Sequence, residues 1–258
     1  MIYDLQKGSL LKRASAFLLD GILLVILITG FAFAFSAIFR YNHYVDIYTA
    51  ALDRYSEQFN IDLSNVPEES SLTEEEKAVY YDAWDAMNED TEMIKAFNMM
   101  IAIIVMELSF SIIISYMLLE FMIPMILKNG QTVGKKIFGL GVMRTNGVRV
   151  RGVSLFIRTF LGKCVIETMV PAMIVAMVLF SASGIMPSVG MFGPIVIVCL
   201  FVAQVILVFW TKKHMMIHDL LSDCIVVDLG SQMIFDSEQA RIDYITKKDA
   251  EEAARSPY

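Results

Sequence analysis

Four long apolar stretches constrain this chain more than any other feature of its sequence. The hydrocarbon core of a bilayer is about 30 Å thick, and a helix that crosses it needs about 20 apolar residues. Residues 14–39, 97–127 and 164–186 reach that length, and the shorter 194–210 ends in a tryptophan, which suits the headgroup level. Buried helices of a soluble protein are the disfavoured alternative, because they rarely exceed about 20 residues without a polar face. Asp20 interrupts the first stretch where a signal peptide would be apolar, so we predict a retained anchor.

Lysine and arginine are distributed unevenly among the connecting segments. Segment 40–96 holds four basic residues against fourteen acidic ones, whereas segment 128–163 holds eight basic residues and no acidic one. Because basic loops favour the cytoplasm, we predict that both termini and segment 128–163 are cytoplasmic and that segment 40–96 faces out. The basic residues behind this topology are Lys7, Lys12, Arg13, Lys128, Lys135, Lys136, Arg144, Arg149, Arg151, Arg158, Lys163, Lys212 and Lys213.

The predicted fold is therefore an all-α polytopic membrane protein with four transmembrane helices, an extracellular helical hairpin and a small cytoplasmic β-hairpin. A cytoplasmic tail and the first span occupy 1–39, and the acidic hairpin occupies 40–96. The predicted order then continues with the second span at 97–127, a basic cytoplasmic segment at 128–163, the third span at 164–186, the fourth span at 194–211 and a cytoplasmic tail at 212–258.

The acidic segment carries its own helical pattern. Apolar residues recur at spacings of three and four from Tyr44 to Phe59, and Thr73 with Glu76 has the spacing of a capping box before a second helix. The aromatic residues either pack against one another or bind a ligand. The acidic surface is either simply solvated or concentrates cations near the membrane.

The basic segment contains a turn signal and an apolar run. Residues 142–150 alternate around Asn146-Gly147, which predicts a β-hairpin with a type I′ turn, and 224–229 is a further strand candidate that could join it. Residues 130–136 resemble a phosphate-binding loop only superficially, because the glycine spacing is wrong and no strand precedes them. The run 155–163, with Arg158 and Lys163, has the composition of an interfacial helix. We expect the basic residues to bind anionic headgroups.

Several ionisable residues lie in or beside the apolar stretches. Arg13 and Asp20 are seven residues apart, so they share a helix face about 10 Å apart along the axis. Glu107 is expected near the midplane and Glu120 nearer the cytoplasm, while Asp219 follows the fourth stretch. Charges in this setting usually pair or face a wet cavity. Two interpretations stay open: a structural network, in which Asp219 binds Arg13 or Arg158, and a path for protons or cations. The candidate charge network comprises Arg13, Asp20, Glu107, Glu120, Arg158 and Asp219.

Other chemistry finds little support in the sequence. The three cysteines are scattered, which gives neither a disulfide framework nor a zinc site. His214 and His218 are four residues apart, as metal ligands can be, but a third ligand at a fitting spacing is missing apart from Asp219. No arrangement suggests a nucleophile with its base. We therefore expect no enzymatic activity, no cofactor, no metal and no nucleic-acid partner.

Several motifs form an ordered set along the chain. The first is an R-x-x-A-x-x-x-D pattern from Arg13 to Asp20, and the second is the run from Gly130 to Leu140 after the second span. Arg158 and the His218–Ser222 segment complete the set, which in this order resembles the RDD family of bacterial integral membrane proteins. The resemblance covers the region 12–229, apart from the acidic hairpin. Where the family usually has Gly-Thr, this chain has Asp223-Cys224, and its outer segment is unusually long.

The resemblance implies that Arg13, Asp20 and Asp219 are the residues that name the family. It also implies a multi-pass protein of the bacterial plasma membrane that transports cations or a small solute coupled to protons. The alternative is a non-transporting accessory or regulatory protein that binds an envelope protein through the outer hairpin. Four spans form a thin wall around any path, so we expect a homo-oligomer.

Overall fold

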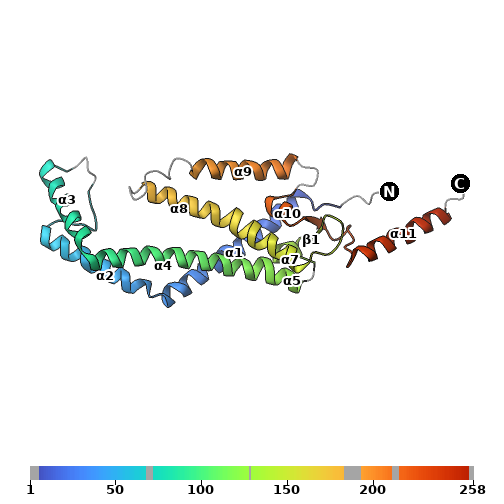
Figure 1. Ribbon diagram of the computed structural model, residues 1–258, viewed down its shortest axis with the longest axis horizontal. Helices are drawn as coiled ribbons and strands as arrows, with labels where there is room; N and C mark the ends of the chain where they lie inside the picture. Colours follow the sequence, from blue (N-terminus) through green and yellow to red (C-terminus); the bar gives the residue numbers. More distant parts are fainter. Residues whose placement is uncertain (1–5, 68–71, 128, 183–192, 211–214, 256–258) are drawn as a thin grey trace. The chain divides into compact units, whose positions relative to one another are not determined.

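The computed structural model describes residues 6–67, 72–127, 129–182, 193–210 and 215–255. These residues form a mostly helical chain with one small sheet (Figure 1). The chain divides into two compact units, residues 1–27 with 112–258 and residues 28–111. In the part of the chain that the structure describes, the mostly helical fold, the four candidate spans and a small antiparallel sheet confirm the predicted fold class.

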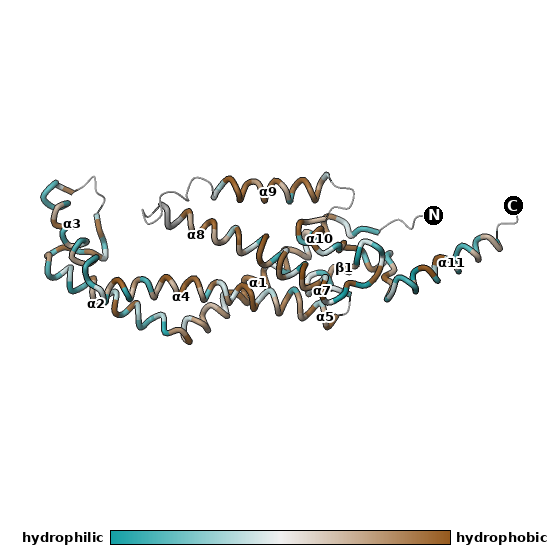
Figure 2. Tube along the Cα trace, in the orientation of Figure 1, coloured by the Kyte–Doolittle hydropathy of each residue, from teal (hydrophilic) through white to brown (hydrophobic). Residues whose placement is uncertain are grey.

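Within the described residues, four helices are long and apolar enough to cross a membrane. They run over Leu10–Ile38, Thr91–Ile126, Gly152–Val178 and Gly193–Trp210. The first is α1 (Leu10–Ile38) and the fourth is α9 (Gly193–Trp210), whose residues are hydrophobic almost throughout (Figure 2). Most of their apolar side chains are exposed, as expected for surfaces that face lipid.

The second and third candidate spans each contain a π-helical segment. The second joins α4 (Thr91–Tyr116), the π-helical η2 (Met117–Met122) and α5 (Ile123–Ile126). The third joins α7 (Gly152–Phe156), the π-helical η3 (Ile157–Met169) and α8 (Val170–Ala182). In π-helix the backbone bonds run from i to i+5, and such segments occur frequently at functional sites.

The third helix differs from the sequence-based boundaries. It runs without interruption from Gly152, so the apolar run 155–163 belongs to the candidate span and is not a separate interfacial helix before it. The reason is that Arg158 and Lys163 are buried against acidic partners, which allows two cations to lie within the helix. Residues 183–186 and 211, at the ends of the predicted third and fourth spans, lie outside the described residues.

The unit of residues 28–111 contains a helical hairpin with its own core. Its helices are α2 (Tyr41–Phe59) and α3 (Glu74–Glu89), which pack on each other. Thr73 caps α3 in a complete capping box with Glu76, as the sequence predicts. Buried Ala51, Ala83 and Met87 form the core, and the aromatic side chains expected there, Tyr48, Tyr55, Phe59 and Trp84, pack around it. The outward location of this hairpin remains a prediction.

The other unit contains a two-stranded antiparallel sheet of β1 (Leu140–Arg144) and β2 (Cys224–Asp228). A turn forms at Asn146-Gly147, with the Gly147 amide donating to the Arg144 carbonyl. The predicted type I′ is wrong, because it needs positive φ at both of these residues and only Gly147, at +84°, has it. The predicted return arm is not a strand, however, and only Arg149 forms a bridge to Met143. The partner of β1 is instead the β-branched run of β2, because both faces of the sheet are buried and a continuous apolar strand can fill them.

Over the described ranges, two short helices and one longer helix complete this unit. The short helices are α6 (Val133–Ile137) and α10 (Ile217–Leu221), and the longer one is α11 (Glu238–Arg255), which has no buried residue. Of the three cysteines, Cys164 and Cys224 are buried and Cys199 on α9 is exposed. The helix α10 packs on η3 and leads directly into β2, so the sheet anchors the segment that carries His218 and Asp219.

Candidate functional site

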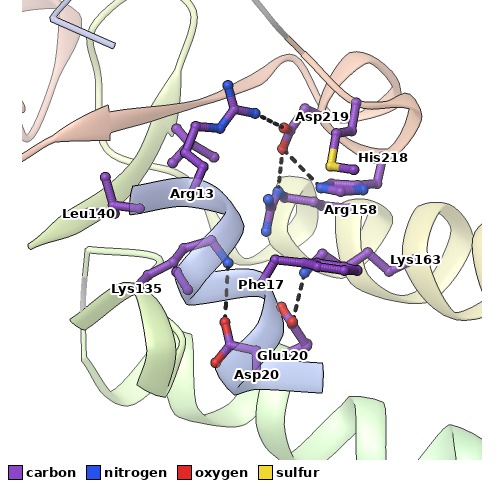
Figure 3. Close-up of a pocket in the computed structure, with 13 residues that line it drawn as sticks. Arg13, Phe17, Asp20, Glu120, Lys135, Leu140, Arg158, Lys163, His218 and Asp219 are labelled. Carbon is purple, nitrogen blue, oxygen red and sulfur yellow. Dashed lines mark hydrogen bonds and ion pairs between the residues drawn. The ribbon is translucent and has the colours of Figure 1, made fainter. Parts of the chain in front are cut away.

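Charged side chains from five elements gather in the unit of residues 1–27 and 112–258 (Figure 3). Asp219 on α10 is 1% exposed and lies beside Arg13, Arg158 and His218 (Figure 3). Its Oδ1 accepts from Nε of Arg158 at 2.8 Å, and its Oδ2 lies 3.9 Å from the guanidinium of Arg13. Burial alone would raise the pKa of Asp219, but the charge of Arg158 outweighs it and holds this pKa below its usual range.

Asp20 is bound by the segment that follows the second span. Its Oδ1 accepts from the Gly134 amide at 2.7 Å, and its Oδ2 accepts from the Thr132 hydroxyl at 2.5 Å. The ammonium of Lys135 lies 3.9 Å from Oδ2. Position 134 has to be glycine for this contact, because a Cβ would lie 2.3 Å from the carbonyl oxygen of Ala16. The sequence around Thr132 is therefore a binding site for this carboxylate and not for a phosphate.

Glu120 on η2 and Lys163 on η3 form the next ion pair, with Nζ 2.7 Å from Oε1. Both side chains are less than a tenth exposed. The hydroxyl of Thr159, one helical turn from Lys163, donates to the backbone carbonyl of Glu120 at 2.8 Å. The second oxygen of this carboxylate, Oε2, is buried with no hydrogen-bond partner among the described residues.

His218 connects two carboxylates. Its Nδ1 lies 2.8 Å from Oε2 of Glu167, and its Nε2 lies 3.4 Å from Oδ1 of Asp219. The side-chain oxygen of Gln204 accepts from the Ile217 amide and fixes the start of α10. The backbone of α10 approaches η3 closely at Gly162, where a Cβ would lie 2.5 Å from the Cβ of His218. Burial lowers the pKa of His218, although its acidic neighbour Asp219 opposes the shift.

Lys135 on α6, like His218, is a titratable residue of the network that lies outside the candidate spans. Its side chain is buried beside both Asp20 and Lys163. Burial lowers the pKa of Lys135 to about 8, and the positive charge of Lys163 acts in the same direction. Lys135 therefore changes charge closer to neutral pH than an exposed lysine would, whereas the lowered pKa of His218 keeps its ring mainly neutral at pH 7.

The π-helical segments explain how one helix contributes several of these groups. Arg158 and Lys163 are five residues apart, which is one turn where backbone bonds run from i to i+5. Four residues further on, Glu167 continues the same side toward His218. In a regular α-helix, residues five apart point in clearly different directions. The π-helix thus aligns these groups.

In the part of the chain that the structure describes, three cavities adjoin the network. The first, about 50 Å³, is lined by Asp219 and Asp20 together with their cationic partners Arg13, Arg158 and Lys135. The second, about 230 Å³, is lined by Asp20, Glu120, Lys163 and Glu167 together with apolar residues of α1. The third, about 210 Å³, is mainly apolar. The first and second share Phe17, Asp20, Glu120, Lys163 and Met216, and the second and third share Glu167 and Gln204.

The model of the RDD family matches residues 7–223, which is most of the chain. The chain belongs to the RDD family. It is accordingly a membrane protein with several apolar helices. Searches of curated proteins and of solved structures find no significant match. The match leaves out α11 and includes the acidic hairpin, which the resemblance alone did not cover.

The structure brings five of the six sequence-predicted network residues of this RDD protein to one site. These are Arg13, Asp20, Glu120, Arg158 and Asp219. Glu107 does not line these cavities and lies in the unit of residues 28–111. Its carboxylate has Ser36 as a hydrogen-bond partner, but its buried oxygen Oε1 has no partner among the described residues. The described residues contain no group of three potential metal ligands around His218, and His214 lies outside them, as do Lys128, Lys212 and Lys213.

Four residues of the network are not among the sequence-based candidates: Lys135, Lys163, Glu167 and His218. From the sequence, the two lysines are expected at lipid headgroups, and His218 is considered only as a metal ligand. A charge balance would have found them, because acidic residues in apolar stretches need buried cations and segment 128–163 supplies eight basic residues without an acid.

Proposed function

We propose that this RDD protein exchanges protons for a small cation or solute across the bacterial plasma membrane. The series of three cavities that share ionisable wall residues carries this proposal. Ionisable residues inside apolar helices commonly face a water-filled cavity and mark the paths of ions or protons, which supports this proposal.

The proposed coupling depends on Lys135. Its ammonium neutralises Asp20, a carboxylate that lines the second cavity. When Lys135 loses its proton, the cavity walls become more negative and attract a cation. When a proton returns, the attraction weakens and the cation leaves. Protons and cations therefore compete for the same charge balance.

The charges that face Lys135 determine the direction of this effect. They are Asp20 on α1, Glu120 on η2, and Arg158 and Lys163 on η3. Because the two cations on η3 oppose protonation and the two carboxylates favour it, removal of either carboxylate lowers proton affinity further. Cation affinity is accordingly expected to rise with pH through about 8.

Reconstituted vesicles test the proposed exchange. The protein is placed in vesicles with an internal pH dye, and outward or inward gradients of Na⁺, K⁺ or Li⁺ are applied. We expect proton movement with the wild type, little with Asp20→Asn, and wild-type movement with Asp53→Asn, an exposed aspartate on α2. Equal rates for wild type and Asp20→Asn would exclude transport through Asp20.

An accessory role is the second candidate, supported by the hairpin α2–α3. The hairpin has a separate core and a capped helix, and it exposes Tyr81 and Val66. Tyr48 and Trp84 pack around that core, so a crosslinker belongs at Tyr81 instead. Recovery of a defined envelope protein from membranes would support this role, and recovery of this chain alone would support only the expected homo-oligomer.

Orientation and lipid contacts belong to the same proposal. Both termini and the sheet are proposed to be cytoplasmic, with Lys136 and Arg151, which are exposed, near anionic headgroups. The protein is proposed to act without enzymatic chemistry or a cofactor.

A further inference from the structure

The second cavity differs from a site for a bare metal ion. A hard cation that sheds its water needs several oxygen ligands directed at one point. Among the described residues no three acidic, histidine or cysteine side chains converge in this way. The oxygens of Asp20 are already bound by Thr132 and Gly134, and both oxygens of Glu167 face His218.

The size of this cavity also exceeds what one ion needs. Its volume is about 230 Å³, whereas a cavity needs only about 10–15 Å³ to hold one water molecule. Among the described residues, one end of its wall holds three carboxylates and a single cation, the Lys163 ammonium, and the rest is mainly apolar: Phe17, Gly21 and Leu24 come from α1, and Met216 precedes α10. A ligand that fills it therefore needs a positively charged group and an apolar body.

One acceptor in the wall lacks a partner. Glu120 lines the cavity with Oε1 bound by Lys163, and Oε2 has no hydrogen-bond partner in the described part of the chain. A buried carboxylate oxygen without a donor is costly, so a turn of the Glu120 side chain that brings Oε2 to a ligand N–H group in the cavity would be stabilised. The aromatic rings of Phe17 and Tyr116, which also line the cavity, suit a neighbouring cation.

From this geometry we infer that the cavity between α1, η2 and η3 binds a small primary or secondary ammonium ion with an apolar substituent, and that this is the cation class moved by the protein. The inference rests on the proposed function and makes it specific. The ammonium group lies against Glu120, and the substituent lies against the α1 residues.

The position of Gly21 provides a direct test. A Cβ built at Gly21 meets nothing within 4 Å, so a larger side chain can enter the cavity from there without striking backbone. Gly30 lies on the same helix, its added Cβ also meets nothing within 4 Å, and it does not line the cavity. Gly21→Leu and Gly30→Leu are thus a matched pair: the same substitution, in the same helix, inside and outside the site.

The experiment is titration calorimetry and thermal unfolding of the full chain in detergent at pH 8.5. The probes are butylammonium, tetramethylammonium and sodium chlorides at equal ionic strength. We expect butylammonium to bind about tenfold or more tightly than tetramethylammonium, because only butylammonium donates a charge-assisted hydrogen bond. Binding is expected to persist in Gly30→Leu and to be lost in Gly21→Leu. Gly21→Ala, the milder change, should weaken it.

Three results would overturn the inference. Sodium that binds as tightly as butylammonium would indicate a metal-ion site. Equal binding of butylammonium to wild type and Gly21→Leu would place the ligand elsewhere, and absence of butylammonium binding would refute the site. The first of these leaves the proposed exchange intact, and the vesicle assay with metal-ion gradients decides that exchange independently.

Discussion

The ion pair of Glu120 and Lys163 provides the sharpest test of the buried network. Both side chains are almost fully buried and their charged atoms lie 2.7 Å apart. Lys163→Met removes the charge and keeps much of the side-chain volume, which leaves the Glu120 carboxylate without its closest cation. Breaking a buried pair in this way costs about 3–5 kcal/mol.

That cost is large against the usual stability of a folded chain, about 5–15 kcal/mol. At about 2–4 °C per kcal/mol for a chain of this size, Lys163→Met should lower the midpoint of thermal unfolding by about 6–20 °C. The double variant Glu120→Gln, Lys163→Met removes both charges. It should recover most of the loss, because replacing a whole buried pair is often neutral.

The assay is thermal unfolding in detergent, with Lys136→Met as the control. Lys136 is an exposed neighbour of the network on α6, and its substitution should change stability by no more than about 0.5 kcal/mol. If Lys163→Met and Lys136→Met cost the same, the pair does not stabilise the fold. If the double variant is as unstable as Lys163→Met, the loss comes from packing and not from an unpaired charge.

Three further predictions concern other parts of the structure. Gly134→Ala should lower the unfolding midpoint, because an added Cβ at this position lies 2.3 Å from a backbone oxygen. Gly152→Ala should not, because an added Cβ there meets nothing within 4 Å. Equal midpoints for the two variants would contradict the close approach of α6 to α1. Unfolding midpoints should rise with pH between about 8 and 10, since the folded chain releases the Lys135 proton near 8 while the unfolded chain keeps it until about 10.4, and the rise should shrink in Lys135→Met. An unchanged slope in that variant would refute the assignment to Lys135. Thr73→Ala should cost about 1 kcal/mol through loss of the α3 cap, measured by hydrogen exchange of α3 amides, whereas Thr73→Ser should be nearly silent.

The sequence predicts the candidate spans and the hairpin helices because these depend on local patterns. Apolar length alone locates α1 and α9, and the Thr73–Glu76 spacing locates the start of α3. The pairing of β1 with β2 depends on residues far apart in the chain, so the local Asn146-Gly147 signal correctly predicts a turn but not the strand that β1 contacts.

The candidate site is less predictable for a geometric reason. Periodicity arguments assume 3.6 residues per turn, and in η3 that assumption separates Arg158 from Lys163 although the π-helix aligns them. Lys135 reaches Asp20 only because a glycine beside it allows two helices to touch. Neither the altered helical turn nor the close contact leaves a clear pattern in a single sequence.

The contrast among the three thiols has a practical consequence. Cys164 and Cys224 are sealed inside protein, whereas Cys199 lies on the apolar surface of α9. A lipid-soluble maleimide should therefore modify the unaltered chain at one position, and a membrane-impermeant, charged reagent should leave it untouched while the bilayer is intact. The chain thus carries a built-in attachment point for a fluorophore or spin label that reports on the fourth helix.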